Sequence, residues 1–332
     1  MAARRRGKKK SGRSYAWRYR GRIVACVFVE VIIICALVIM IGWNKGVKEW
    51  FEQFEQPVLK EVDISGINSP NAILMQARGG KILGEINGEA QIYPASMTKI
   101  MTVILGIENF DDLDEKITLT NEMFTGLYEQ DATQAGFQPG EEVRVIDLLY
   151  GAMLPSGAEC CIALADTISG SEADFAELMN KKARKLGMEN TNFCDSTGLH
   201  NPDHYSTVKD IAVLMKYCIK NDTFREIVET SRHSTGVTNI HPDGITYYST
   251  MFKNLSDPTV TGGKILGGKT GYTSEAGHCL VSFAEIEGRE YIFVSAGASG
   301  ADGNTIPHIQ DAVTVYNRVG AAIEAKMNNN NK

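Results

Sequence analysis

Residues 23–43 form an almost wholly apolar run, IVACVFVEVIIICALVIMIGW, which constrains the architecture more than any other feature of the chain. At about 1.5 Å per residue, a helix of this length spans roughly 30 Å, the thickness of the hydrocarbon core of a bilayer. Residues 1–22 contain ten Arg and Lys side chains and no acidic one. Because basic residues stay on the cytoplasmic side, we expect a basic cytoplasmic tail, a transmembrane signal-anchor helix at 23–43, and an extracytoplasmic remainder. A cleaved signal peptide is the alternative, although its apolar region usually has about 7–15 residues.

The charge is unevenly distributed along the chain. The formal net charge is −6, but without the ten basic residues of the tail, 24 basic and 40 acidic residues leave a balance of −16. A basic arm on an acidic body is also typical of proteins that bind nucleic acid. The apolar run that follows the arm favours a membrane instead, so no nucleic-acid partner is expected.

The rest of the chain divides into a linker, one folded domain and a short tail. Residues 44–66 are predicted as a juxtamembrane linker, residues 67–325 as the folded domain, and the polar end KMNNNNK (326–332) as a disordered tail. Hydrophobic residues make up 43% of the chain and charged residues 22%, which suffices for a globular core.

The order of the predicted elements indicates an α+β fold. Alternating and apolar runs predict strands at residues 72–77, 83–87, 267–273, 279–286 and 289–298. Apolar residues at helical spacing predict helices at 96–108, 146–154, 160–168, 172–187, 208–219 and 307–325. Because strands occur near both ends and helices between them, we expect an antiparallel sheet built from both chain ends and a helical subdomain.

The cysteines do not form a recognisable framework. Five of the seven follow the apolar run: Cys160, Cys161, Cys194, Cys218 and Cys279. An odd number at scattered spacing predicts neither a set of disulfides nor a zinc site. We expect most of them to be buried free thiols, and no metal or cofactor is predicted.

The first motif with a chemical meaning is Ser96-Met97-Thr98-Lys99, after a proline and at the start of an apolar helix. Positions i and i+3 share a helix face, so the amine of Lys99 is expected beside the hydroxyl of Ser96. A serine hydroxyl becomes a good nucleophile only when a base accepts its proton. A lysine serves as that base when burial or another cation lowers its pKa.

Two further elements strengthen this motif. Lys269-Thr270-Gly271 follows two glycines on a predicted strand and presents an ammonium, a hydroxyl and a residue without a Cβ, so that an extended peptide can approach the strand edge. Ser156, in the turn between two predicted helices, is a second serine that can relay protons. A plain helix cap is the alternative for Ser156. S-x-x-K and K-T-G are weak motifs separately, but in this order and about 170 residues apart they are specific.

The set S-x-x-K, S-x-N and K-T-G is typical of penicillin-binding proteins and β-lactamases. The chain most resembles the low-molecular-mass D-alanyl-D-alanine carboxypeptidases. The resemblance runs from about residue 71 to residue 325 and includes ILGEINGEAQIYPASMTKIMT, FQPGEEVRVIDLLYGAMLPSG and TNFCDSTGLHNPDHYST. It implies a β-lactamase/transpeptidase-like fold for the predicted domain.

The resemblance also implies a mechanism. Ser96 would attack the carbonyl between the two terminal D-alanines of a peptidoglycan stem peptide and form an acyl-enzyme, with Lys99 as general base and Ser156 as proton relay. Lys269 and Thr270 would bind the terminal carboxylate of the substrate. Gly271 would lie at the substrate strand. The backbone N–H groups of Ser96 and Tyr272 would form the oxyanion hole. β-Lactams would act as covalent inhibitors, and no cofactor is needed.

The chain departs from this family at one motif position. The family usually has Ser-Gly-Asn at the second motif, whereas this chain has Ser156-Gly157-Ala158-Glu159. The methyl group of Ala158 cannot make the contacts of an amide with the lysine and the substrate. A D,D-endopeptidase or transpeptidase on the same machinery therefore stays open, as does a weakened scaffold that only binds peptidoglycan.

A rival of another chemical class rests on His200, Asp203, His204 and Tyr205. Such a cluster can be part of a zinc site, and zinc-dependent D,D-peptidases exist. The stretch has no second source of ligands, and the family resemblance accounts for it without a metal. A hydrogen-bonded loop is therefore the favoured interpretation.

Overall fold

The computed structural model describes residues 31–32, 59–300 and 306–330. The predicted basic tail at residues 1–22, most of the predicted membrane span at 23–43 and residues 44–58 of the predicted linker lie outside the described residues. Within the described part of the chain, no helix is long and apolar enough to cross a membrane. The described residues from 59 onwards belong to one compact unit, which is described here by itself.

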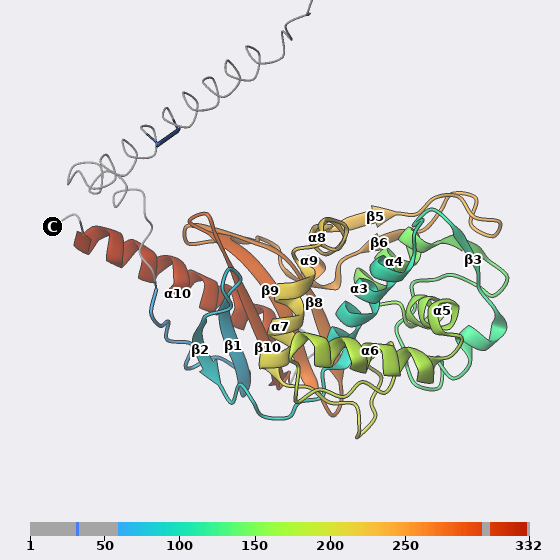
Figure 1. Ribbon diagram of the computed structural model, residues 1–332, viewed down its shortest axis with the longest axis horizontal. Helices are drawn as coiled ribbons and strands as arrows, with labels where there is room; N and C mark the ends of the chain where they lie inside the picture. The colour runs from blue at the N-terminus through green and yellow to red at the C-terminus, as the bar shows by residue number, and fades with distance from the viewer. Residues whose placement is uncertain (1–30, 33–58, 301–305, 331–332) are drawn as a thin grey trace, which may run out of the picture. The chain divides into compact units, whose positions relative to one another are not determined.

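The centre of this unit is a six-stranded antiparallel sheet with the order β2-β1-β10-β9-β8-β7 (Figure 1). Its strands are β1 Asn71–Gln76, β2 Ile82–Ile86, β7 Thr259–Val260, β8 Gly263–Thr273, β9 Gly277–Ile286 and β10 Arg289–Ala298. β1 pairs with β10, so the two ends of the domain meet in the middle of the sheet. The predicted sheet built from both ends of the chain is confirmed.

Helices cover both faces of the sheet. The helices of the sheet faces and of the helical subdomain are η1 Ala95–Thr98, α3 Lys99–Asn109, η2 Asn121–Phe124, α4 Val145–Met153, α5 Ala158–Ser169, α6 Glu172–Leu186, α7 Val208–Cys218, α8 Asp222–Glu229, α9 Thr250–Asn254 and α10 Pro307–Asn330. α7 lies on β1, β9 and β10, and α10 covers the opposite face (Figure 1). Two small hairpins, β3 Lys116–Thr118 with β4 Glu142–Arg144 and β5 Arg232–Ser234 with β6 Thr246–Tyr248, complete the helical side.

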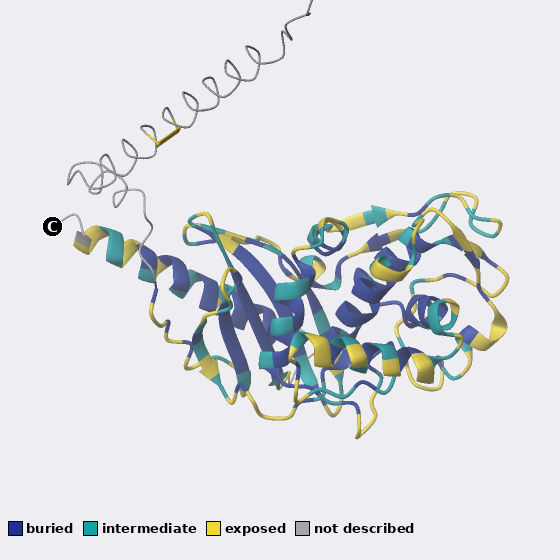
Figure 2. Cartoon of the chain, viewed as in Figure 1, coloured by how far each residue is buried: buried dark blue, intermediate teal, exposed yellow. Residues whose placement is uncertain are grey.

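The alternation of side chains along the strands explains this three-layer arrangement. Neighbouring residues of a strand point to opposite faces. In β10, Ile292 and Val294 belong to the core below the helical subdomain, whereas Tyr291 and Phe293 belong to the core below α10. Both faces of the sheet are therefore apolar and buried, as the dark central strands of Figure 2 show.

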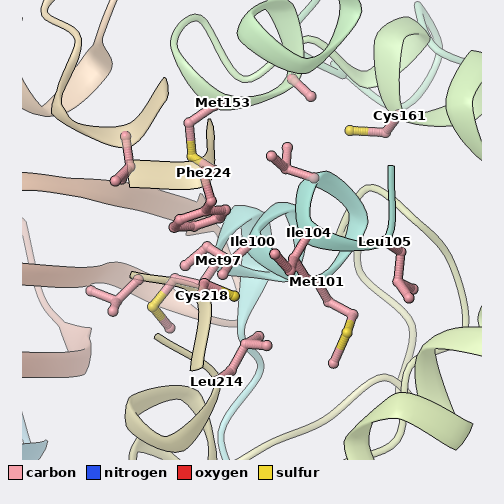
Figure 3. Close-up of a cluster of buried hydrophobic side chains, with 14 of the residues drawn as sticks. Met97, Ile100, Met101, Ile104, Leu105, Met153, Cys161, Leu214, Cys218 and Phe224 are labelled. Carbon is pink, nitrogen blue, oxygen red and sulfur yellow. The ribbon is translucent and has the colours of Figure 1, made fainter. Parts of the chain in front are cut away.

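α3 lies at the centre of the helical subdomain. Its side chains Ile100, Met101 and Ile104 point into a cluster that also contains Met153 and Phe224 (Figure 3). The first eight residues of α3 are all buried. A helix surrounded by packed side chains cannot shift without opening cavities. The motif at the start of α3 therefore rests on a rigid support.

Two of the predicted boundaries are wrong. Residues 326–330, predicted as disordered, continue α10, because Met327 extends the apolar stripe formed by Val319 and Ile323. Residues 59–66, predicted as linker, belong to the folded unit. Leu59 and Val62 are buried against the α10 side of the sheet.

Candidate active site

Ser96 and Lys99 meet at the start of α3. Ser96 lies in the 3-10 turn η1 and is half-buried, whereas Lys99 is 3% exposed. The Nζ atom of Lys99 donates a hydrogen bond to Ser96 Oγ at 3.1 Å and another to the backbone oxygen of Thr197 at 2.6 Å. The predicted contact between the two motif residues is present, with the amine directed at the hydroxyl.

The second wall of the site is β8, which lies against η1. Lys269 is fully buried, and its ammonium donates only to the backbone oxygen of Thr270, at 3.0 Å. Burial and the nearby charge of Lys99 hold the pKa of Lys269 well below its usual range. None of the ion pairs among the described residues involves Lys99 or Lys269. A protonated Lys269 therefore lacks a counter-ion among the described residues, and an anionic ligand would supply one.

Gly271 brings the two walls into contact. A Cβ atom at this position would lie 3.0 Å from the backbone nitrogen of Ser96 and 3.2 Å from the backbone oxygen of Pro94. A glycine is therefore needed for β8 to pass so close to the nucleophile turn. The next residue, Tyr272, is 60% exposed at the edge of β8. The backbone amides of Ser96 and Tyr272 thus belong to two segments in contact, as an oxyanion hole requires.

Ser156 forms the third wall, between α4 and α5. It is 7% exposed and has a φ of +74°, a conformation that costs roughly 1–3 kcal/mol in a residue other than glycine. Ala95, directly before Ser96, has a φ of +47°. One strained backbone position is therefore the predicted relay serine itself, and another directly precedes the predicted nucleophile. The structure shows no hydrogen bond from Ser156 Oγ to another described residue, so its relay role stays a prediction.

Ala158 begins α5, and its neighbour Glu159 does not compensate for the missing amide. Glu159 Oε1 accepts hydrogen bonds from the backbone N–H groups of Ala135, at 2.6 Å, and Gly136, at 2.9 Å. Glu159 Oε2 is buried and has no hydrogen-bond partner in the structure. Burial raises the pKa of Glu159. Its carboxyl group therefore supports the loop at residues 135–136.

Cys161 lies one turn further along α5, where the charges of Lys99 and Lys269 both act on its thiol. Burial nevertheless raises its pKa to about 12. A thiol that keeps its proton is a weak nucleophile, so Cys161 does not compete with Ser96. The five described cysteines are free, and the four other than Cys194 are buried. This confirms the prediction of buried thiols for most of them.

Thr250 is a site residue that the sequence did not predict. Its Oγ1 lies 2.7 Å from Thr270 Oγ1, and its backbone N–H donates to the oxygen of Leu154 at 3.0 Å. Thr250 therefore connects β8 with the segment that precedes Ser156. A single threonine at the start of the five-residue helix α9 carries no motif, so only the fold identifies it.

The two histidines considered for zinc have different hydrogen-bond and ring partners. His204 is buried and bonds to Thr98 and Asp195, whereas His200 contacts the ring of Tyr93 and lies 3.8 Å from Glu275. No group of three His, Cys, Asp or Glu side chains that suits a metal occurs in the described part of the chain. The stretch is a hydrogen-bonded loop beside η1.

A profile of the D-alanyl-D-alanine carboxypeptidase family matches residues 58–300, which contain all three walls of this site. The chain belongs to this family. Ser96, Lys99, Ser156 and Lys269, the residues predicted from the sequence motifs, all lie within the matched range.

Individual members of the family agree with this assignment. The D-alanyl-D-alanine carboxypeptidase DacF of Bacillus subtilis is 35% identical over 233 residues, which cover 69% of this chain and 57% of the relative. The D-alanyl-D-alanine carboxypeptidase DacC of Escherichia coli is 33% identical over 262 residues, which cover 71% of this chain and 58% of the relative. The chain thus spans less than three fifths of the length of these two relatives.

A solved structure shows the same fold. The crystal structure of the Streptomyces K15 DD-transpeptidase matches with a TM-score of 0.69 at 29% identity, covering 79% of this chain and 100% of that one. The antiparallel sheet with its helical subdomain is therefore the D,D-peptidase fold that the sequence motifs predict.

Proposed function

We propose that this chain is a serine-type D-Ala-D-Ala carboxypeptidase that removes the terminal D-alanine from peptidoglycan stem peptides. The contact of 3.1 Å between Lys99 Nζ and Ser96 Oγ carries this proposal. A buried amine in contact with a serine hydroxyl is the arrangement that activates a serine nucleophile. The family membership and the named activity of its relatives support the substrate class.

The reaction follows from the three walls. Lys99 acts as the general base and accepts the proton of Ser96 as Oγ attacks the carbonyl carbon of the penultimate D-alanine. The N–H groups of Ser96 and Tyr272 stabilise the oxyanion. Ser156 passes the proton to the leaving amine, and D-alanine departs. Water then hydrolyses the ester on Ser96 and restores its hydroxyl.

Two buried amines in one site favour this chemistry. Burial and the nearby charge of Lys99 lower the pKa of Lys269, and a carboxylate bound beside Lys269 would favour its protonated form. The ammonium of Lys269, with the hydroxyl of Thr270, would then bind the terminal carboxylate of the substrate. β-Lactams, which also carry a carboxylate beside a reactive carbonyl, would acylate Ser96 covalently.

The cellular location belongs to the proposal as well. Residues 23–43 would anchor the chain in the cell membrane, with residues 1–22 in the cytoplasm and the catalytic domain outside. This part rests on the apolar run and the ten basic residues before it. An extracytoplasmic domain would lie on the side of the membrane where peptidoglycan is found.

A labelling experiment tests the proposed chemistry. The purified full-length chain is incubated with a fluorescent penicillin, and the covalent adduct is measured on a denaturing gel and by mass spectrometry. We expect a stoichiometric adduct on Ser96 in the wild type and none in Ser96→Ala. Absence of an adduct in a folded wild type would leave only the role of a peptidoglycan-binding scaffold.

A D,D-endopeptidase or transpeptidase activity is the second candidate, because the matching Streptomyces structure is named a DD-transpeptidase. Mass spectrometry of the products from a pentapeptide and from a cross-linked dimer separates the activities. Loss of one D-alanine supports the carboxypeptidase, whereas cleavage or formation of the cross-bridge supports the alternative.

A further inference from the structure

The loop at residues 194–199 packs directly onto the nucleophile turn. The backbone oxygen of Thr197 accepts from Lys99 Nζ at 2.6 Å, and the backbone oxygen of Ser196 accepts from Thr102 Oγ1 at 2.6 Å. Gly198 completes the contact, because a Cβ there would lie 1.9 Å from the backbone oxygen of Ala95. The catalytic lysine is thus held between Ser96 and a carbonyl of this loop.

Asp195 determines the shape of the loop. Its Oδ1 accepts three hydrogen bonds, from Thr197 N at 2.8 Å, Thr197 Oγ1 at 2.7 Å and Gly198 N at 2.7 Å. Its Oδ2 lies 3.1 Å from His204 Nδ1. Burial alone would raise the pKa of Asp195, but the contacts with His204, Thr197 and Gly198 outweigh it and lower the pKa to about 2. The carboxylate that aims the Thr197 carbonyl is therefore ionised.

His204 closes the loop back onto the S-x-x-K motif. Its Nε2 lies 2.9 Å from Oγ1 of Thr98, the residue directly before Lys99. The imidazole is 2% exposed and packs edge-on against Phe193. When Nδ1 carries the ring proton and donates to Asp195, Nε2 accepts a hydrogen bond from the Thr98 hydroxyl. The backbone nitrogen of Cys194 lies 3.3 Å from the same Nδ1 atom and can donate to it only in the other tautomer. The contacts of Asp195 and Thr98 therefore hold the ring at its two nitrogens.

These contacts form a closed ring from Lys99 through Thr197, Asp195, His204 and Thr98 back to Lys99. We propose that His204 is a positioning residue, which holds the Thr197 carbonyl against Lys99 through Asp195 and so keeps the amine directed at Ser96. This inference rests on the proposed function. A lysine side chain has four rotatable bonds, and the hydrogen bond to Thr197 restricts them before the substrate arrives. A displacement of about 1 Å in a catalytic group can cost roughly 100-fold in rate.

The test compares His204→Phe and His204→Gln with the wild type. The second-order rate constant of acylation by a fluorescent penicillin is measured, and the dissociation constant of non-covalent binding is measured in a Ser96→Ala background. We expect His204→Phe to slow acylation about 10- to 100-fold with unchanged binding, because only the lysine is misdirected. His204→Gln, whose amide can bond to both neighbours, should recover most of the rate.

A matched control is available in the same chain. His241 Nδ1 lies 2.8 Å from the fully buried Glu141, in a pair that joins the turn before β4 to the loop of the β5–β6 hairpin. His241→Phe should lower the thermal unfolding midpoint as His204→Phe does, but leave acylation unchanged. Equal slowing by both variants would mean that lost stability alone explains the effect, and would overturn the positioning role.

Other outcomes also decide the question. Acylation at the wild-type rate in folded His204→Phe overturns the inference. If His204→Phe does not fold, Thr98→Val removes one contact of the ring with almost no change of shape and should still slow acylation about 5-fold. If the wild type itself forms no adduct, the proposed function fails, and crystal structures of the wild type and His204→Phe then decide the positioning role. Retention of both Lys99 contacts in the variant would overturn it.

Discussion

Ala158 occupies the first position of α5, two residues after Ser156, and its methyl group offers no hydrogen bond. Glu159 is bonded to residues 135 and 136 and cannot supply one in its place. Ala158→Asn is therefore expected to raise the rate of penicillin acylation about 5-fold, the equivalent of one hydrogen bond of about 1 kcal/mol. Stopped-flow acylation measures the rate. An unchanged rate would mean that another group already serves this position.

One hydrogen bond joins the hydroxyl groups of Thr250 and Thr270 and uses one of their two hydroxyl protons. The other hydroxyl can therefore donate a hydrogen bond to a ligand. Thr250→Val should raise KM about 5-fold for a peptide with a free terminal carboxylate, because Thr270 loses the hydrogen bond of about 1 kcal/mol that orients its hydroxyl toward the carboxylate. KM for the same peptide with a terminal amide should not change.

The control for Thr250 is a second pair of hydroxyls. Thr246 Oγ1 lies 2.9 Å from Ser234 Oγ in the exposed β5–β6 hairpin. Thr246→Val should leave KM unchanged for both peptides. If Thr250→Val raises KM equally for the free and the amidated peptide, Thr250 does not recognise the carboxylate.

At the scale of the elements, the loop at residues 194–199 can pack on η1 only because Gly198 has no side chain. Gly198 has a φ of +78°, and a Cβ would meet backbone atoms of Ala95 at 1.9 and 2.5 Å. Gly198→Ala should therefore lower the free energy of unfolding by about 3 kcal/mol. Gly187 has a φ of +80° but open space around it, so Gly187→Ala should cost only about 1 kcal/mol. If urea unfolding shows equal losses of unfolding free energy for Gly198→Ala and Gly187→Ala, the loop at residues 194–199 moves away from η1 without an energetic cost.

Most elements were predictable because periodicity is a local property. The predicted strand at residues 289–298 has the bounds of β10, and the predicted helix at 172–187 ends one residue beyond α6. α6 also carries its own end signals, a Ser171 cap that accepts from Asp174 N and a left-handed Gly187. The wrong boundaries at residues 59–66 and 326–330 have a different cause. Those residues are ordered by contacts with distant parts of the chain.

At the scale of the whole molecule, His308 makes stability depend on pH. It lies at the start of α10, is 5% exposed, and stacks on His278 of β9 at a centroid distance of 5.0 Å. Burial and the charge of His278 lower its pKa from 6.5 to about 4. Between these values the unfolded chain binds a proton that the folded chain does not, so stability falls as the pH falls.

The size of this effect follows from the shift. Between pH 7 and pH 4, the wild type should lose about 3 kcal/mol of unfolding free energy through His308. His308→Phe, which keeps an aromatic ring in the stack, should lose about 3 kcal/mol less over the same range. Urea unfolding of the two proteins at both pH values measures the difference. Parallel pH profiles would contradict the assignment.

The sequence by itself determined the chemistry that lies within a few residues of one chain segment. Ser96 and Lys99 share a helix face because they are three residues apart, and Gly271 follows Lys269 on one strand. These relations depend on local backbone geometry, which is the same wherever the segment lies. The α+β class and the pairing of both chain ends also followed from the order of local patterns.

Only the tertiary structure decided which distant groups complete the site. The Thr197 carbonyl meets Lys99 across 98 positions of sequence, and Thr250 meets Thr270 from another element. A backbone carbonyl has no residue identity to read, and a lone threonine or histidine has no pattern. Their roles arise from the packing of the loop at residues 194–199 on η1 and of α9 on β8.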